Sequence, residues 1–549
     1  MKPLLLSALF ITTALSSACA PTAKQVEPEP PMVNAKQYQA QGILAATLPE
    51  IMTALEQGDI SSQALVSAYI ERIENIDRNG PKLQSVLALN PNALAQAAAL
   101  DAQRANGNIL GPLHGVPILL KDNIESKDDV ATTAGALALK DNITGRDSPL
   151  VAGLREQGAI ILGKTNLSQW ANFRSEGSMS GWSALGGQVR NPHMLDRNPC
   201  GSSSGSGAAT AASLAAASVG TETNGSVICP SNANGIVGFK PTVGVVPQDY
   251  IIPISNSQDT AGPMTKSVMG AAVMMNAMAT TTPNVDYTQG LTKNALKDVR
   301  VGVLNFAKGN SKPILAHFDA ALKDLEAAGA VLVNIEERPA TPSDFNKMSY
   351  DILKYEFKDT LNHYLASTSE EQVKTRNLEQ LIAFNEANKD TELALFDQSI
   401  FEASQAMDSV ESEEYQKAVQ AVQKATREDG IDFLLSQHKV QVLIAPSGPI
   451  VPRVDPINGD VWPNAWPGYG GHAARAGYPH ATVPMGGIHG LSVGLSFIGA
   501  KNADANVLAY AYGYEQQSQK ILTPQYFENA EAVPAVAEAM RGFAQSKQD

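Results

Sequence analysis

The distribution of apolar positions divides the chain into helix-like and strand-like stretches. Within residues 47–105, side chains such as Leu65, Tyr69 and Ile73 recur every three to four residues, which is the spacing of one buried helix face. Residues 343–430 are rich in alanine and in charged residues, and they are also predicted to be largely helical. These two regions therefore supply most of the expected helix.

Short uninterrupted apolar runs predict strands that are buried on both faces. One run follows a turn within residues 108–123 and ends at Lys121, and a helix over residues 151–162 leads into a second run, A-I-I-L. Later runs are residues 299–304, 331–335, 440–445 and 493–498. A long loop rich in proline, glycine and tryptophan is expected over residues 448–471. Strands that alternate with helices predict an α/β protein.

Residues 1–18 are predicted to be an export signal. The apolar run between Lys2 and Cys19 is too short to span a bilayer, and small residues precede the cysteine. Cys19 also resembles the acylated cysteine of bacterial lipoproteins, although the nearest leucine lies four places before it rather than three, so ordinary cleavage is the alternative. Residues 19–45 are proline-rich and predict a tether. Residues 46–540 are expected to form one domain in the periplasm or cell envelope of a bacterium.

Composition restricts the classes of partner. The chain has 549 residues, of which 44% are hydrophobic, and a formal net charge of −14 at pH 7. This acidic balance argues against a broad basic surface for nucleic acid. Cys200 and Cys229 are the only cysteines besides Cys19, so no disulfide framework is expected. One bridge between them is conceivable, but two small buried residues are the preferred interpretation.

Several short motifs match known active-site patterns without the structural context that those sites need. Residues 158–165 match the P-loop of ATP-binding proteins, but their middle is an apolar strand instead of a phosphate-binding turn. Residues 201–205 and 490–494 match the G-x-S-x-G nucleophile motif without its strand-to-helix turn. Residues 436–439 match S-x-x-K without companion motifs. The eight histidines show no metal-ligand spacing.

Two turns rich in serine and glycine lie within residues 198–242. They read N-P-C-G-S-S-S-G-S-G and V-G-T-E-T-N-G-S-V-I-C-P, and a helix-forming segment over residues 208–217 separates them. Glycine and serine turns of this kind let backbone N–H groups converge on a small volume. A catalytic serine needs a base and N–H donors for an oxyanion. One helix between the turns would bring Ser202 close to Ser226.

Three motifs follow one another in a fixed order. Lys121 lies in G-V-P-I-L-L-K-D-N, Ser202 in C-G-S-S-S-G-S-G and Ser226 in T-E-T-N-G-S, with I-V-G-F-K-P-T after them. In this combination the chain resembles the amidase signature family, over most of residues 47–520. The resemblance implies an α/β/α fold around one large mixed sheet and a Ser–Ser–Lys triad. It also implies that neither a metal nor an organic cofactor takes part.

The resemblance assigns a role to each residue of the triad. Ser226 would attack the amide carbonyl carbon, Ser202 would relay the proton, and Lys121 would be the base in its neutral form, which burial favours. Ser203 is an expected auxiliary residue. Backbone N–H groups would stabilise the oxyanion, and they belong to Thr223, Asn224, Gly225 and Ser226. The peptide before Ser202 is cis in the family. If each residue is considered separately, the alternative interpretations are a cation at a strand end for Lys121, a loop serine for Ser202 and a helix N-cap for Ser226.

Two positions depart from the family pattern. Asn224 occupies a position where relatives usually have glycine, and Ile228 one where many have arginine. Asparagine is among the least costly replacements for glycine if position 224 needs a left-handed backbone. Because the expected oxyanion donors are backbone groups, a side chain at this position is compatible with activity.

Longer segments around the motifs narrow the resemblance. Residues 167–175 read L-S-Q-W-A-N-F-R-S, and residues 251–264 read I-I-P-I-S-N-S-Q-D-T-A-G-P-M. These segments are most similar to bacterial peptide amidases, which implies hydrolysis of C-terminal peptide amides with release of ammonia. Trp170, Asn172 and Phe173 are expected to line the mouth of the site, and core packing is the alternative for all three.

Two other functions remain open. The transamidating subunit of a tRNA-dependent amidotransferase shares the triad, but it needs cytosolic partners and tRNA, which the export signal and acidic charge disfavour. The other is a catalytically inactive, envelope-binding protein, and the departure from the family pattern at Asn224 is the reason to consider it. The preferred function, an exported amidase, predicts a small-molecule or peptide amide as substrate. It predicts neither nucleic acid nor an obligate protein partner, with Cys19 as a membrane tether.

Overall fold

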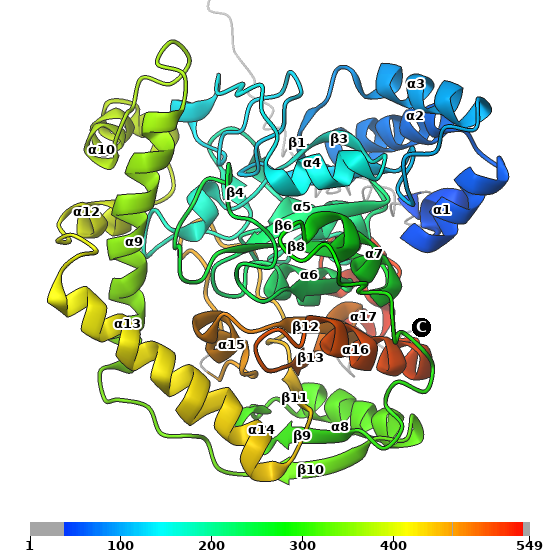
Figure 1. Ribbon diagram of the computed structural model, residues 1–549, viewed down its shortest axis with the longest axis vertical. Coiled ribbons are helices and arrows are strands. Elements are labelled where there is room, and N and C mark those ends of the chain that lie inside the picture. The colour runs from blue at the N-terminus through cyan, green and yellow to red at the C-terminus, as the bar shows by residue number, and fades with distance from the viewer. Residues whose placement is uncertain (1–37, 464, 542–549) are drawn as a thin grey trace, which may run out of the picture. The chain divides into compact units, whose positions relative to one another are not determined.

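One mixed sheet of eleven strands organises the computed structural model, which describes residues 38–463 and 465–541 (Figure 1). The strand order is β1-β3-β2-β6-β8-β7-β12-β13-β11-β9-β10. These strands are β1 (Val86–Leu89), β2 (Pro117–Lys121), β3 (Ile160–Thr165), β6 (Ala217–Glu222), β7 (Val237–Lys240), β8 (Thr260–Thr265), β9 (Arg300–Leu304), β10 (Val331–Ile335), β11 (Val442–Pro446), β12 (His480–Ile488) and β13 (Leu491–Ile498). A separate pair is formed by β4 (Trp182–Ser183) and β5 (Gly187–Gln188).

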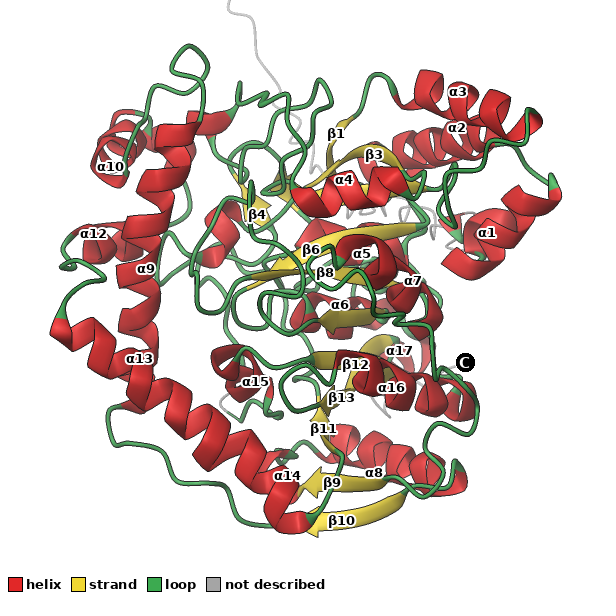
Figure 2. Cartoon of the chain, viewed as in Figure 1, coloured by secondary structure: helices red, strands yellow, loops and turns green. Residues whose placement is uncertain are grey.

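Helices cover the sheet (Figure 2). They are α1 (Leu48–Gln57), α2 (Ser62–Arg72), α3 (Ala93–Ala105), α4 (Pro149–Glu156), α5 (Ser204–Ala211), α6 (Ile228–Asn234), α7 (Val268–Met278), α8 (Lys312–Ala327), α9 (Phe345–Ser367), α10 (Leu378–Ala387), α11 (Lys389–Glu392), α12 (Ser399–Gln405), α13 (Glu413–Thr426), α14 (Asp432–His438), α15 (Gly470–Ala476), α16 (Asp504–Ser518) and α17 (Pro534–Arg541). Helix α7 contacts α4 and α16, and α16 contacts α8, whereas α5 packs with α6. The expected α/β/α fold with one large mixed sheet is confirmed.

The burial of the central strands explains why uninterrupted apolar runs predicted β2 and β3. Every residue of β2, β3 and β6 is buried. Strands β3, β2 and β6 run parallel, and β2 ends at Lys121. Strand β3 contains residues 160–165 of the stretch that matches a P-loop, so the middle of that match is a strand and not a phosphate-binding turn, as the sequence predicted. The carboxyl ends of these strands meet at one edge of the sheet.

Several predicted boundaries need correction, including the helix over residues 151–162, which ends at Glu156 before β3 begins at Ile160. The helix expected over residues 208–217 ends at Ala211, because Ala217 already pairs with Ile118 in the ladder between β2 and β6. Residues 47–105 are not wholly helical, since they contain β1. Strands β6, β7, β8 and β12 were not among the predicted runs, and in β12 the apolar pattern is interrupted by Pro484 and Gly486 at a bulge.

The packed part of the chain begins before residue 46, where the sequence analysis placed the start of the domain. Ile43 and Leu44 pack against the main core, and Tyr38 makes an edge-on contact with Tyr526, with ring centroids 5.9 Å apart. The predicted signal, Cys19 and most of the predicted tether lie outside the described residues.

A second layer of helices forms a wall beside the sheet, at the left of Figure 1. Helix α9 contacts α12 and α13, and α10 contacts α12. Phe357 and Phe401 stack with ring centroids 5.2 Å apart. This cluster also contains Trp170 and Phe173, so it connects the wall to the segment that was expected to line the site.

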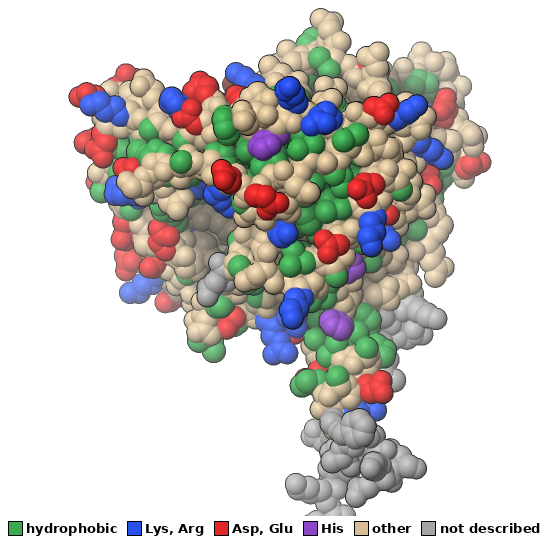
Figure 3. All heavy atoms as spheres, turned by 90° about the horizontal axis from the view of Figure 1, so that it is seen from below, with side chains coloured by type: hydrophobic (Ala, Val, Ile, Leu, Met, Phe, Trp, Pro, Cys, Tyr) green, Lys and Arg blue, Asp and Glu red, His purple; other side chains and the backbone are tan. Residues whose placement is uncertain are grey.

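The distribution of charge on the surface and the hydropathy of the helices agree with what the composition indicated. On the face shown in Figure 3, acidic and basic side chains are interspersed, without an extended patch of one sign. The helices in the described part of the chain include none whose length and hydropathy would let it span a bilayer.

Candidate active site

Lys121 and Ser202 meet in the interior of the protein. Lys121 Nζ lies 2.8 Å from Ser202 Oγ and 2.8 Å from Thr221 Oγ1, and both Lys121 and Ser202 have no exposed surface. Lys121 comes from the end of β2, Thr221 from β6, and Ser202 from the loop before α5. The Gly201–Ser202 peptide is cis, as the resemblance implied. Two of the three predicted residues are therefore in direct contact.

Burial changes the titration of Lys121. Loss of water lowers the pKa of Lys121 to about 7, against the opposing attraction of Asp259 and Glu222. The neighbouring Asp122 points elsewhere, because its carboxylate accepts hydrogen bonds from Thr133 and from the backbone around it. A lysine with such a pKa is substantially neutral at physiological pH, so its amine can accept a proton.

Ser226 borders a cavity of about 360 Å³, which we call the Ser226 cavity. Ser226 is 8% exposed, whereas Ser202 is fully buried. Ser203 N donates to Ser226 O at 3.2 Å, and Ser203 Oγ donates to Thr221 O at 3.0 Å. Ser203 thus ties the Ser226 loop to β6. Among the described residues no hydrogen bond joins the hydroxyls of Ser202 and Ser226.

Glu222 organises the loop around Ser226, and sequence analysis did not identify it. Its Oε2 accepts hydrogen bonds from Val227 N at 2.8 Å and Ile228 N at 2.9 Å, at the start of α6. Its Oε1 is buried without a hydrogen-bond partner among the described residues. A carboxylate four residues before Ser226, ahead of a short helix, was the available signal, since acidic groups favour helix N-termini.

The backbone of the loop differs from one expectation. Gly225 has φ +87°, whereas Asn224 is not among the residues with positive φ. The left-handed position is therefore Gly225, and Asn224 needs no special backbone tolerance. Thr223 is held by its hydroxyl, which donates to Asp259 Oδ1 at 2.6 Å. Asp259, also unidentified from sequence, is buried, and burial raises its pKa to about 6.

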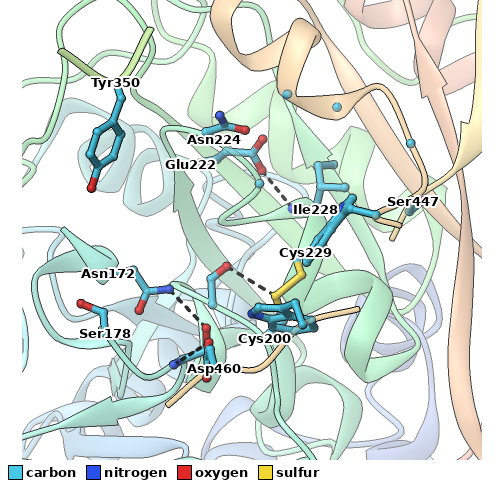
Figure 4. A pocket seen from close by; sticks show the side chains of 18 of the residues that line it. Asn172, Ser178, Cys200, Glu222, Asn224, Ile228, Cys229, Tyr350, Ser447 and Asp460 are labelled. Atoms are coloured by element: carbon cyan, nitrogen blue, oxygen red, sulfur yellow. Dashed lines mark hydrogen bonds between the residues drawn. A yellow bond between two sulfur atoms is a disulfide. The ribbon is translucent and has the colours of Figure 1, made fainter. Parts of the chain in front are cut away.

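Cys200 and Cys229 form a disulfide, with Cα atoms 5.8 Å apart. The preferred interpretation of two separate buried cysteines is wrong, because the turn before α5 and the start of α6 lie against each other. Figure 4 shows this disulfide with Glu222 and Asn224 among the residues that line a second cavity of about 580 Å³. We call it the adjoining cavity, since it shares Asn172, Gly201, Asn224, Tyr350 and Arg475 with the Ser226 cavity.

The three residues expected at the mouth have different positions. Asn172 lines both cavities and Phe173 lines the Ser226 cavity. Trp170 is 2% exposed and packs edge-on against Phe401, with centroids 5.6 Å apart, so it belongs to the core. Arg475, on α15, lines both cavities and was missed, because it lies far from the motifs in the sequence.

In residues 38–463 and 465–541, no group of three or more histidine, cysteine, aspartate and glutamate side chains is arranged to hold a metal ion. The chemistry that the described site offers is that of hydroxyl groups, a partly neutral amine and backbone donors. Such a set is suited to acyl transfer.

The fold and the site define an acyl-transferring α/β enzyme, and comparisons with known proteins identify its family. The family model described as Amidase matches residues 64–508. A probable amidase of Arabidopsis thaliana is 35% identical over 494 residues, covering 86% of this chain and 90% of the relative. The crystal structure of native peptide amidase from Stenotrophomonas maltophilia has a TM-score of 0.81 and 41% identity, covering 87% of this chain and 98% of that one.

A third relative belongs to another functional group. It is one of the subunits of the glutamyl-tRNA(Gln) amidotransferase of Acinetobacter baylyi, and it is 32% identical over 509 residues, covering 85% of this chain and 95% of the relative. The chain therefore belongs to the Amidase family, the amidase signature enzymes, and it is an amide-hydrolysing enzyme.

Proposed function

We propose that the protein hydrolyses the C-terminal amide of peptides through an acyl-enzyme on Ser226. The observation that carries this proposal is the buried contact between Lys121 Nζ and Ser202 Oγ, at 2.8 Å, next to the loop that holds Ser226 at a cavity. A buried lysine of lowered pKa beside a serine is the arrangement that a proton relay requires.

In the proposed reaction, Ser226 Oγ attacks the carbonyl carbon and its proton moves to Ser202, whose own proton moves to Lys121. The oxyanion that forms faces the backbone N–H groups of residues 223–226. Lys121 then returns a proton through Ser202 to the nitrogen, the C–N bond breaks, and ammonia leaves. Water attacks the resulting ester by the same relay and releases the peptide acid.

The preference for peptide amides is supported by the 41% identical peptide amidase and by the cavities. The Ser226 cavity and the adjoining cavity, of about 360 and 580 Å³, are large enough for several residues of a peptide on the acyl side. Asn172 lines both, and its amide group can pair with a peptide backbone.

One peptide in three forms tests this function: the C-terminal amide, the free acid, and a version extended by one residue. We expect ammonia from the first and no cleavage of internal bonds in any of them. Rapid internal cleavage, or a preference for fatty-acid amides, would refute the proposed substrate class. Labelling of Ser226 by a fluorophosphonate separates a hydrolase from an inactive envelope-binding homologue.

The amidotransferase relatives motivate a second candidate, a transamidating subunit that delivers ammonia to a partner. That candidate requires a cytosolic location, and cell fractionation distinguishes the two. We propose export to the periplasm or cell envelope instead. The disulfide between Cys200 and Cys229 supports export, since disulfides persist mainly in oxidising compartments.

A further inference from the structure

Arg475 supplies the only ionic charge among the described side chains that line the Ser226 cavity. All other residues that border this cavity are uncharged, including Asn172, Asn224 and Tyr350. Arg475 lies on α15, a short helix over Gly470–Ala476. The cavity that contains the proposed nucleophile therefore has a positive electrostatic bias.

The guanidinium of Arg475 is incompletely satisfied by the protein. Its Nη1 donates to Gly471 O at 3.0 Å, and its Cζ lies 5.3 Å from the ring centroid of Phe345. Within the described residues no carboxylate forms an ion pair with it. A guanidinium has five N–H donors, and a partly desolvated one gains most from a planar anionic acceptor. The unused donors are thus available to a ligand in the cavity.

Asn224 lies near this charge without neutralising it. A side chain at Gly471 would meet Arg475 Nη1 at 2.9 Å and Asn224 Oδ1 at 3.7 Å, so the two groups approach the same point from different elements. Asn224 offers a neutral amide at the place where a carboxylate would be close enough to attract the guanidinium. Arg475 also lines the adjoining cavity, but there its charge is opposed by three carboxylates, those of Glu176, Glu222 and Asp460. An anion would therefore be favoured on the Arg475 side and disfavoured beyond it.

We propose that Arg475 makes the enzyme selective for amides whose acyl portion carries a carboxylate, such as peptide amides with glutamate or aspartate at the amidated end. This inference rests on the proposed function. The substrate carboxylate accepts paired hydrogen bonds from the guanidinium while the amide carbon faces Ser226. A charge-assisted pair of this kind is worth roughly 10- to 100-fold in kcat/KM over an uncharged substrate.

The test compares two blocked peptide amides that differ only in the last residue, glutamate or methionine, which have similar length. For the unaltered enzyme we expect kcat/KM to be about 10-fold or more higher for the glutamate peptide. Arg475→Gln should bring the ratio close to one, mainly by lowering kcat/KM for glutamate. Asn224→Asp should also reduce the ratio, because the new carboxylate competes for the guanidinium.

Arg338→Gln is the matched control. Arg338 is exposed and lines neither cavity. Burial lowers the pKa of His472, and the charges of Arg475 and Arg338 lower it further, so both arginines act on the same region. This variant should retain the preference for glutamate. If the preference depended only on the total positive charge near α15, both arginine variants would lose it to the same extent. That result would contradict the proposal.

Three further results would overturn the inference. An enzyme that cleaves both peptides equally would leave the proposed function intact and remove the selectivity. An Arg475→Gln variant that loses both activities by the same factor would assign Arg475 a general role in binding or folding. If neither amide is cleaved, the proposed function fails, and calorimetric binding of the two amides to the Ser226→Ala variant still tests recognition. Equal affinities for the two would overturn it.

Discussion

Ser226 and Ser202 have different surroundings, and the proposed mechanism gives them different roles. Ser202 is fully buried with its Oγ 2.8 Å from Lys121 Nζ, so it cannot reach a substrate, but it can transmit a proton. Ser226 borders a cavity and can reach one. The proposed relay uses this difference, since one hydroxyl contacts the base and the other faces the cavity, and in it neither serine could replace the other.

Replacing Ser226 by alanine should abolish amide hydrolysis while the protein remains folded. Loss of the nucleophile removes covalent catalysis, so kcat should fall by on the order of 10⁴-fold or more. Lys121→Ala should cost several orders of magnitude, and the double variant little more than Ser226→Ala alone, because the residues act as one unit. Ammonia release and circular dichroism provide the measurements.

Ser436→Ala serves as the control for this prediction. Ser436 lies in the S-x-x-K match, its hydroxyl bonds only to Phe433 O within the described residues, and it is exposed. It should retain full activity. A Ser226→Ala variant with a tenth of the original rate would show that another group is the nucleophile.

The pH dependence of the reaction should follow the ionisation of Lys121. Burial lowers the pKa of Lys121 to about 7, and only the neutral amine accepts a proton. The value of kcat/KM should therefore be low when the pH is below 7, and it should rise through pH 7 to a plateau. Steady-state rates between pH 5 and pH 9 on a peptide amide measure this limb.

Asp259→Asn provides a directional check on the pH prediction. The charge of Asp259 raises the pKa of Lys121 against the effect of burial, so its removal should lower that pKa further. The limb should shift to lower pH in this variant. A shift to higher pH, or an unchanged limb in an active Lys121→Ala variant, would show that another group controls the profile.

At the scale of elements, the site depends on how the start of α5 and the start of α6 are held together. The disulfide between Cys200 and Cys229 joins the loop that carries Ser202 to the helix that follows Ser226. Glu222 holds the same helix start by two backbone hydrogen bonds. The covalent link and the carboxylate therefore fix the same loop from two sides.

Removing the disulfide with Cys200→Ser and Cys229→Ser together should destabilise the protein and lower its activity. For the 29-residue separation, the chain-entropy model gives roughly 3–4 kcal/mol, or a fall in Tm of about 3 °C for a chain of this size. Differential scanning calorimetry and kcat measure the two effects. Titration of free thiols is the control, since two reactive thiols in the non-reduced enzyme would contradict the bridge.

Sequence patterns predicted the elements near the motifs, but they did not predict the contacts between segments that are distant in the sequence. Lys121 was placed correctly at a strand end, because the apolar run before it is uninterrupted and β2 is buried on both faces. The disulfide and Arg475 could not be predicted, since their contacts depend on how α5, α6 and α15 pack. Trp170 was expected at the mouth of the site, but it packs in the cluster formed with α9 and α12. The sequence of those helices did not show that they would cover Trp170.

For the molecule as a whole, the acidic charge bears on the choice between the two candidate functions. The formal net charge of −14 and the interspersed charges on the face in Figure 3 offer no broad attraction to tRNA on that face. A transamidating enzyme would need such a partner. The acidic charge therefore gives no support to the transamidating candidate, which cell fractionation tests directly.

Expression in a bacterium should produce a mature chain that begins at Cys19 and carries lipid. Small residues precede Cys19, and the proline-rich residues after it would hold the domain away from a membrane. Mass spectrometry of the mature N-terminus should find an acylated cysteine, and a Cys19→Ser variant should move from the membrane fraction to the soluble fraction with unchanged kcat. An unmodified Cys19 at the N-terminus would support ordinary signal cleavage, and a start further along would exclude the anchor. Retention of the whole precursor in the cytosol would contradict export itself and would make transamidation the leading alternative.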